Sequence, residues 1–149
     1  MNNGGIRANL LAGDVNFGRL YEVQPFGNTL FTLTVRGADL RAYLARLVAG
    51  TALRAHVSGA QLRYDMARPA DDRLTDVTVA GRPIDPKRTY TITLNDFMVT
   101  GGDGLGLAGV ALATRATNIV DLDALVAYVK ARPQGIAAPT VDRIVSVTP

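Results

Sequence analysis

Three glycine-containing segments of this sequence carry residue types that could bind a small polar ligand. The first, Asn3-Gly4-Gly5-Ile6-Arg7, begins with an asparagine and paired glycines, and paired glycines let a backbone pass close to a ligand. Its Arg7 adds a planar fork of N–H donors that suits an anion or two neighbouring oxygens. Glycine pairs before an arginine also occur in ordinary loops, so this segment fits a loop without a ligand as well.

The second segment, residues 95–104, reads Asn-Asp-Phe-Met-Val-Thr-Gly-Gly-Asp-Gly and directly follows a predicted strand. Three glycines around an acidic residue make a loop that can wrap a small ligand. Phe97 offers a flat face on which a ring can stack, and Asp103 offers acceptors for a pair of ribose hydroxyls. The alternative is a turn at the end of a strand, with Phe97 in the core.

The third segment, Gln24-Pro25-Phe26-Gly27-Asn28, leads into a predicted strand that starts at Thr29. Proline, glycine and asparagine at this spacing are typical of a turn. The sequence therefore favours a tight turn whose Phe26 side chain packs inward.

Composition restricts the classes of protein that these segments could serve. Of the 149 residues 48% are hydrophobic and 19% charged, which predicts one globular domain, residues 1–149. The absence of cysteine excludes disulfides, thiolate catalysis and cysteine metal sites. The net charge is +3, but the basic residues are spread along the chain, so polynucleotide binding is not predicted. There is neither an apolar run long enough for a membrane span nor a recognisable signal peptide at the first residues.

Two helices are predicted from the spacing of apolar residues. The first follows Gly37 and ends near Gly50, and its inner face consists of Leu40, Tyr43, Leu44, Leu47 and Val48. The second runs from Leu122 to Arg132, with Asp121 as its N-cap and Pro133 as its stop.

Five β-prone runs lie around these helices. They are residues 29–35, 60–65, 74–79, 89–94 and 141–147. Short strands interleaved with two helices predict an α+β (mixed α/β) fold, a single compact domain with mixed β-sheets flanked by helices.

The order of the motifs along the chain is more specific than any one of them. They are Asn-x-Gly-Gly-Ile-Arg at 2–7, Pro-Phe-Gly-Asn at 25–28, Val-Ser-Gly at 57–59, Asp-Pro-Lys-Arg-Thr-Tyr at 85–90 and the segment 95–104. This series resembles the C-terminal domain of the 5'-nucleotidase and UDP-sugar hydrolase family. The resemblance covers practically the whole chain, and the loop that starts at Phe97 is its most specific part.

The resemblance implies that this chain is the substrate-binding part of a two-domain hydrolase. In the family, an N-terminal metallophosphoesterase domain holds two divalent metal ions, and the C-terminal domain binds the nucleoside and rotates to deliver it. A two-metal site needs a cluster of histidine and carboxylate ligands, but this sequence has one histidine, His56. We therefore expect no catalytic residue, metal or cofactor in this chain, which by itself should be inactive. The N-terminal domain is absent from residues 1–149.

The resemblance also implies substrate contacts, residue by residue. Arg7 resembles the arginine that meets the substrate near ribose and phosphate. Phe97 resembles one of two aromatic residues that sandwich the base. Asp103 resembles the carboxylate that accepts hydrogen bonds from the ribose hydroxyls, with Gly101 and Gly102 shaping the loop around it.

Three further positions have less defined roles. Asn28 lies in a family motif, where its role is substrate binding or structural. The second base-stacking aromatic of the family stands three residues before the Val-Ser-Gly turn, where this chain has Arg54. Arg54 could stack through its guanidinium. His56 occupies the position of a polar base contact in some relatives, or it is an exposed turn residue.

The resemblance thus predicts a domain that binds a nucleotide or nucleoside, within an exported enzyme of nucleotide catabolism. Its substrates would be 5'-nucleotides, UDP-sugars or 2',3'-cyclic nucleotides, and its location periplasmic, cell-wall or secreted. Two alternatives stay open. Arg54 in place of the aromatic fits a thiosulfohydrolase-like relative with a non-nucleotide substrate. A structural or dimerisation domain without a ligand would instead have an apolar inter-domain face.

Overall fold

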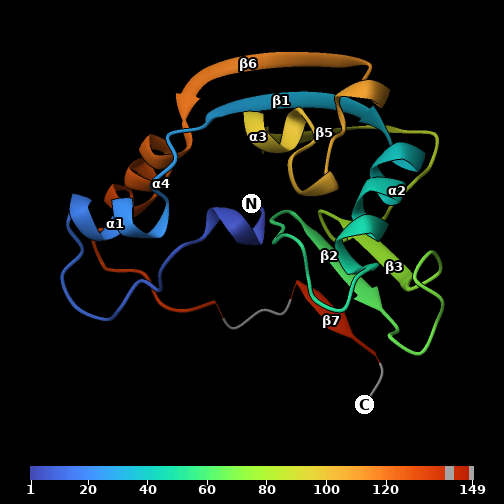
Figure 1. Ribbon diagram of the computed structural model, residues 1–149, viewed down its shortest axis with the longest axis horizontal. Helices are drawn as coiled ribbons and strands as arrows, with labels where there is room; N and C mark the ends of the chain where they lie inside the picture. The colour runs from blue at the N-terminus through green and yellow to red at the C-terminus, as the bar shows by residue number, and fades with distance from the viewer. Residues whose placement is uncertain (140–142, 148–149) are drawn as a thin grey trace.

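The computed structural model describes residues 1–139 and 143–147, which form two β-sheets (Figure 1). In the first sheet the central strand β1 pairs antiparallel with a strand on each side. The strands of this sheet are, in spatial order, β5 (Thr89–Asn95), β1 (Thr29–Arg36) and β6 (Ala113–Val120).

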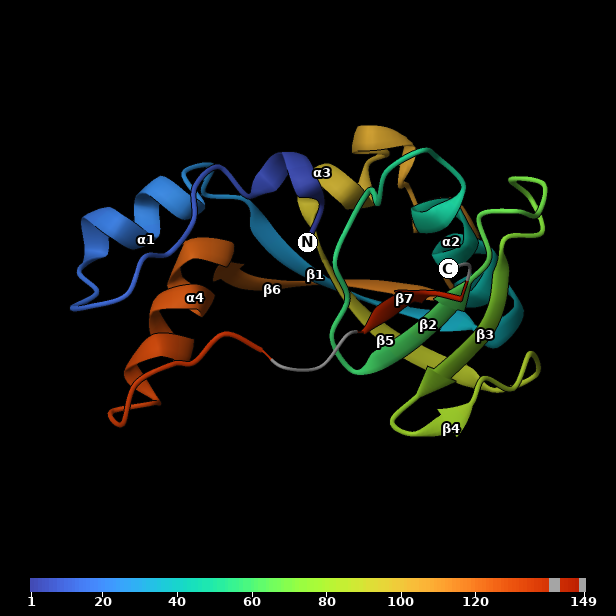
Figure 2. The same cartoon turned by 90° about the horizontal axis from the view of Figure 1, so that it is seen from below.

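The second sheet is mixed, because its last strand runs parallel to its neighbour while the other pairs are antiparallel. Its strands are, in spatial order, β4 (Arg82–Pro83), β3 (Leu74–Val79), β2 (Ala60–Tyr64) and β7 (Ile144–Ser146). Seen from below, this sheet lies across one end of the first sheet (Figure 2).

Helices lie at both ends of the first sheet. Helices α1 (Phe17–Val23) and α4 (Asp121–Lys130) lie together at one end, while α2 (Gly37–Val48) packs near the second sheet (Figure 1). A single turn, α3 (Asp96–Val99), directly follows β5. The predicted α+β fold with mixed sheets flanked by helices is confirmed. Among the described residues, no helix has the length and apolarity to cross a bilayer.

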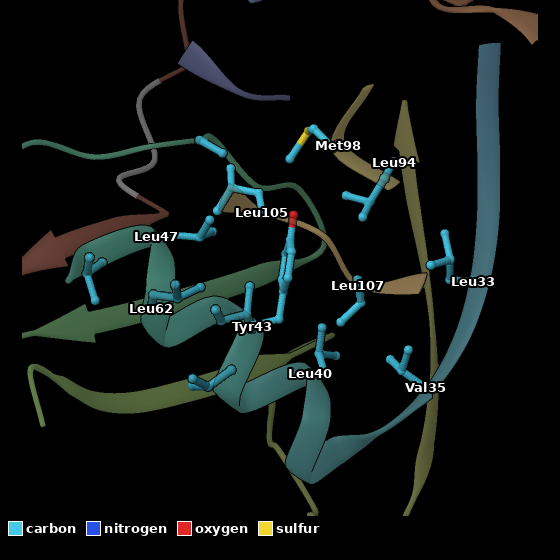
Figure 3. Close-up of a cluster of buried hydrophobic side chains, with 14 of the residues drawn as sticks. Leu33, Val35, Leu40, Tyr43, Leu47, Leu62, Leu94, Met98, Leu105 and Leu107 are labelled. Atoms are coloured by element: carbon cyan, nitrogen blue, oxygen red, sulfur yellow. The ribbon is translucent and has the colours of Figure 1, made fainter. Parts of the chain in front are cut away.

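The core lies where α2 packs between the two sheets (Figure 3). All five apolar residues of the predicted inner face of α2 are buried. They pack against side chains of both sheets, among them Leu33 and Val35 of β1, Leu62 of β2 and Leu94 of β5. Burial of these side chains is the main favourable contribution to folding, about 1.5–3 kcal/mol for each large aliphatic side chain.

Several predicted boundaries move by one or two residues. Helix α2 begins at Gly37 itself, and α4 begins at Asp121 and ends at Lys130. The prediction that Asp121 caps α4 is therefore wrong: Val120 is the N-cap, and Asp121 instead bonds to the turn before β1 through its backbone N–H and its carboxylate. Of the predicted final strand, residues 144–146 form β7, and residues 141–142 lie outside the described part of the chain.

Helices α1 and α3 and strands β4 and β6 were not predicted. Strand β6 reads Ala-Thr-Arg-Ala-Thr-Asn-Ile-Val, so it lacks the alternation of apolar and polar residues that marks a half-buried strand. It is an edge strand whose residues are mostly exposed. Helix α1 has seven residues, too few for a helical period to show, and one of them, Leu20, is buried.

Gly37 stands where two backbone segments come close together. Its N–H donates to the carbonyl of Arg88 at 2.8 Å. A Cβ atom at this position would overlap the backbone carbonyl of Asp85 and lie 2.9 Å from the ring of Tyr90. The start of α2 therefore requires a residue without a side chain, because the turn at 85–90 occupies that space.

We expect Gly37→Ala to lower the free energy of unfolding by about 1–3 kcal/mol, because the added methyl group forces the backbone apart. Urea denaturation followed by circular dichroism measures this. The matched control is Gly109→Ala, where a Cβ atom would meet nothing within 4 Å. Equal midpoints for the two variants would contradict the close approach at Gly37.

Tyr43 of α2 places a titratable hydroxyl inside the core, with 2% of the residue exposed. This hydroxyl makes no hydrogen bond within the described part of the chain. Burial raises the pKa of Tyr43 from 10.0 to about 12, and the Arg46 guanidinium, 5.2 Å from the centre of the ring, opposes this in part.

We expect this burial to make the folded state less stable at high pH. Between pH 10 and 12 the unfolded chain loses the Tyr43 proton and the folded chain keeps it, so stability falls by roughly 2–3 kcal/mol over that interval. Below pH 10 both states hold the proton and the contribution is constant. The difference in unfolding free energy between wild type and Tyr43→Phe, measured from pH 8 to 12, isolates this effect. A difference independent of pH would contradict it.

Candidate functional site

The register of the first sheet brings two of the sequence motifs together. Because β1 and β5 are antiparallel and Leu30 lies opposite Asn95, the turn before β1 meets the segment after β5. The backbone N–H of Thr29 donates to the carboxylate of Asp96 at 3.1 Å across this junction. Two segments that lie about 70 residues apart in sequence thus become neighbours at one end of the sheet.

A pocket of about 200 Å³ lies at this junction. Residues from the N-terminal segment, which includes the 3-10 turn η1 (Asn3–Gly5), complete its wall. The pocket is lined by Asn2, Gly4, Gly5, Phe26, Asn28, Phe97 and Asp103. All three glycine-containing segments that the sequence singled out therefore contribute to a single pocket.

Asp103 lies in the 3-10 turn η2 (Gly102–Gly104) with left-handed backbone angles, φ 55° and ψ 20°. The flanking Gly101 and Gly104 also have positive φ, 110° and 68°, which glycine adopts without steric cost. The Asp103 carboxylate accepts a hydrogen bond of 2.7 Å from the side-chain amide of Asn2, which is 3% exposed. This buried partner fixes the orientation of a carboxylate that belongs to an otherwise exposed residue.

Phe97 is half exposed, with 45% of its surface accessible, so it is a wall of the pocket and not a core residue. It stands in the first turn of α3, whose start is capped by the Asn95 side chain accepting from the N–H of Met98 at 2.9 Å. Its ring packs directly on the Cα of Gly102, because a Cβ atom there would overlap the ring. Gly102 thus determines where the Phe97 ring can lie.

The prediction that Phe26 packs inward is wrong. Phe26 is 52% exposed and lines the same pocket as Phe97. Gly27, which follows Phe26, adopts φ 63°, a left-handed conformation that glycine adopts without steric cost. The guanidinium of Arg7 lies 5.9 Å from the centre of the Phe26 ring and donates to the carbonyl of Gly4 at 3.3 Å.

Asn28 lines the pocket and also holds the turn in place. Its side-chain amide donates to the carboxylate of Asp121 at 3.1 Å, and its carbonyl accepts from the N–H of Asp121 at 2.8 Å. These two bonds connect the pocket to the start of α4. Asn28 therefore has a structural role in addition to its position in the pocket wall.

Arg7, Arg54 and His56 do not line the pocket. Arg7 lies beside it, over Phe26, and Arg54 lies behind the loop of Asp103, with its guanidinium 3.4 Å from the Asp103 carbonyl. His56 is exposed and lies at a different hollow, of about 530 Å³, beside β5. The structure thus brings Phe97, Asp103 and Asn28 together and places His56 elsewhere.

Two residues of the pocket wall had no predicted ligand role, Asn2 and Phe26. Asn2 opens the Asn-x-Gly-Gly-Ile-Arg motif, but only the fold reveals that its amide reaches Asp103, 101 residues away. Among the described residues there is no group of three or more histidine, aspartate or glutamate side chains that could hold a metal ion.

Comparison with known proteins finds a family model and several proteins that are similar to this chain. A family model described as "5'-nucleotidase, C-terminal domain" matches residues 1–109. The chain is similar to Endonuclease YhcR of Bacillus subtilis, with 36% identity over 97% of this chain and 12% of that protein. It is also similar to Protein UshA of Yersinia enterocolitica, with 32% identity over 87% of this chain and 23% of that protein.

A solved structure shares the fold. The crystal structure of a 5'-nucleotidase precursor from Thermus thermophilus superposes with a TM-score of 0.91 and 33% identity, covering 99% of this chain and 31% of that one. This chain therefore spans less than a third of the length of each of these relatives. The match to the family model and the close agreement of the folds show that the chain belongs to the 5'-nucleotidase C-terminal domain family.

Proposed function

We propose that this chain is the substrate-recognition domain of a two-metal 5'-nucleotidase-type phosphohydrolase, and that its pocket binds the nucleoside part of a nucleotide. The observation that carries the proposal is the presence of the Phe97 ring and the Asp103 carboxylate in one pocket. An aromatic face suits a planar base, and an adjacent carboxylate suits the two hydroxyls of a ribose.

Each pocket residue has a definite part in this proposal. The base stacks on the half-exposed face of Phe97, and the ribose hydroxyls donate to Asp103. The bond from Asn2 occupies one lone pair of the Asp103 Oδ2 atom and holds the carboxylate still, so less side-chain freedom is lost on binding. Arg7, beside the pocket, carries the positive charge that would meet a phosphate.

The hydrolytic step belongs to a second domain in this proposal. The relatives are several times longer than this chain, which leaves room in them for an N-terminal metallophosphoesterase domain with two divalent ions. Such ions polarise a phosphoryl oxygen and activate water, and the described residues here offer no cluster of ligands for them. The enzyme would act in nucleotide catabolism, in the periplasm, cell wall or outside the cell.

The size of the pocket implies weak binding to this domain by itself. Its volume of about 200 Å³ is below the roughly 300–1,000 Å³ of typical small-molecule sites. A base and ribose would therefore remain partly open to solvent, and the second domain would supply the remaining contacts. We expect dissociation constants in the high micromolar to millimolar range, about −4 to −6 kcal/mol.

We expect adenosine and AMP to cause saturable amide shifts in residues 101–104 when titrated into the chain and followed by NMR. Phe97→Ala should weaken binding about 5- to 100-fold, because stacking contributes roughly 1–3 kcal/mol per base. Asp103→Asn should weaken the binding of adenosine more than the binding of 2',3'-dideoxyadenosine, because only adenosine has the two ribose hydroxyls. Thiosulfate and sulfate serve as competing ligands.

Two results would contradict the nucleoside site. One is the absence of any shift at 10-fold the expected dissociation constant, that is, at roughly 10 mM ligand. The other is saturable binding of thiosulfate in the same loop with no response to nucleosides, which would favour a thiosulfohydrolase-like substrate. Oligonucleotide binding with a steep dependence on salt would indicate a polynucleotide ligand instead.

The contact between the Phe97 ring and Gly102 allows a second test of the nucleoside site. Gly102→Ala inserts a methyl group where the ring lies, so the ring must move. Because the ring is half exposed, we expect a change in unfolding free energy of about 1 kcal/mol or less, but a loss of adenosine affinity close to that of Phe97→Ala. Gly109→Ala is the control. Unchanged affinity for Gly102→Ala would show that the ring position does not matter for binding.

A further inference from the structure

The sequence contains a single asparagine that is followed directly by a glycine, the pair Asn3-Gly4, and Gly4 lines the candidate pocket. An asparagine loses its side-chain amide when the backbone nitrogen of the next residue attacks its Cγ atom, and asparagine is for this reason a thermolabile residue. A glycine at the next position favours the attack, because it has no Cβ atom to shield the nitrogen and its backbone is the most flexible. The pair therefore has the residue types that spontaneous deamidation requires.

Both residues of this pair are exposed, and the attacking nitrogen belongs to Gly4. Gly4 stands inside the 3-10 turn η1, whose two backbone bonds run from Gly5 to Asn2 and from Ile6 to Asn3. Neither bond uses the N–H of Gly4, and this N–H makes no hydrogen bond within the described part of the chain. Hydroxide can therefore remove its proton without any bond of the protein opening first.

Two other positions at the pocket have related chemistry but are protected by the fold. Asn2 is 3% exposed, and the N–H of the following Asn3 donates to a backbone carbonyl at 2.9 Å. Asp103 precedes Gly104, and an aspartate before a glycine can form the same cyclic imide with loss of water. However, the Asp103 carboxylate is held by Asn2, and the N–H of Gly104 donates to the carbonyl of Gly101 at 3.0 Å. The fold therefore directs the reaction to Asn3.

We propose that Asn3 is a site of spontaneous deamidation and that the reaction alters the N-terminal wall of the pocket. The Gly4 nitrogen, after losing its proton to hydroxide, bonds to Cγ of Asn3, and the bond between Cγ and Nδ2 breaks. The amide nitrogen leaves as ammonia after taking a proton from water. Water then opens the cyclic imide, at Cγ to give aspartate or at the main-chain carbonyl carbon to give isoaspartate. The net change is uptake of water and release of ammonia.

Either product removes a contact that holds the first residues in place. The side-chain amide of Asn3 donates to the carbonyl of Leu53 at 2.6 Å. A carboxylate has no N–H to donate, so in the aspartate product an oxygen faces this carbonyl and repels it. In isoaspartate the main chain gains a methylene group between Asn2 and Gly4. That group enlarges the ring closed by the bond from the Gly5 N–H to the Asn2 carbonyl, so η1 cannot keep its form.

The altered residue lies beside several groups of the pocket wall. Asn2, Gly4 and Gly5 line the pocket, and Asn2 also orients the carboxylate of Asp103. The reaction replaces a neutral amide by a negative charge, so the modified chain differs from the fresh one in both charge and backbone at this wall. None of these steps depends on which ligand the pocket binds.

The test keeps the folded chain at mildly alkaline pH and follows its proteolytic peptides by mass spectrometry. We expect the Asn3 peptide to gain the mass difference between amide and carboxyl before any other asparagine peptide does. Gly4→Ala is the matched control, because Gly4 lacks a positive φ and a Cβ atom there would lie 3.5 Å from the Asn2 amide and 3.6 Å from the Asp103 carboxylate. The alanine stiffens the backbone and shields its nitrogen, so the reaction should slow at least about threefold.

Comparison with the chain unfolded in guanidinium chloride separates the effect of sequence from that of the fold. Asn3 should react in the folded chain at a rate within about threefold of that in the unfolded chain, because its attacking N–H has no bond to break. Isomerisation of Asp103 should rise at least about 10-fold on unfolding, because two hydrogen bonds protect it in the fold. Enzymatic methylation of isoaspartate carboxylates measures the product at both positions.

The effect on the pocket wall is measured from amide NMR spectra without added ligand. In the aged chain the signals of Gly5 and Asp103 should shift in proportion to the extent of reaction, while those of Phe17 should not. Gly4→Ala aged for the same time should show much smaller changes.

Three results would overturn the inference. One is that Asn3 reacts no faster than Asn9, which is also exposed but is followed by Leu10. A second is that Gly4→Ala reacts as fast as wild type, which would indicate direct hydrolysis of the amide. The third is an unchanged NMR spectrum after conversion of Asn3, which would leave the modification without effect on the pocket wall.

Discussion

The antiparallel pairing of β1 with both of its neighbours determines where the pocket can form. Strand β1 starts where β5 and β6 end, so the turn at 25–28 meets α3 on one side and the start of α4 on the other. At its far end β1 leads directly into α2, which carries the largest share of the core. The pocket and the core are therefore placed by the same eight-residue strand, one at each of its ends.

The sequence was enough to predict those elements in which the spacing of apolar residues marks a buried face. Helix α2 shows a helical period because one face is buried, and its five predicted inner residues are all in the core. Strand β6 and helix α1 could not be found in this way, because most of their residues face solvent and their patterns carry no period. The N-cap of α4 was misplaced because Asp121 uses its carboxylate for Asn28, a contact about 90 residues distant in sequence.

The candidate site was predictable in its composition and less so in its geometry. Glycines around Asp103 and the nearby Phe97 indicated a loop for a polar, ring-containing ligand, and both residues line one pocket. Phe26 was assigned to the interior because turn chemistry predicts a turn but not which way a side chain points from it. Asn2 had no predicted role, because a buried amide acquires its partner only in the folded chain.

The bond between Asn2 and Asp103 also bears on the order of events during folding. It joins residues 101 positions apart, so the contact between the N-terminal wall of the pocket and the loop of Asp103 requires a long loop to be closed. Closure of so long a loop costs conformational entropy before any contact compensates for it, and such contacts slow folding. During synthesis from the N-terminal end, residues 1–3 can bond to residues 53–56 before residue 103 has been made, whereas Asn2 gains its partner Asp103 only afterwards. The contact between the N-terminal wall of the pocket and the loop of Asp103 thus becomes possible later than the contacts of the same N-terminal residues with residues 53–56.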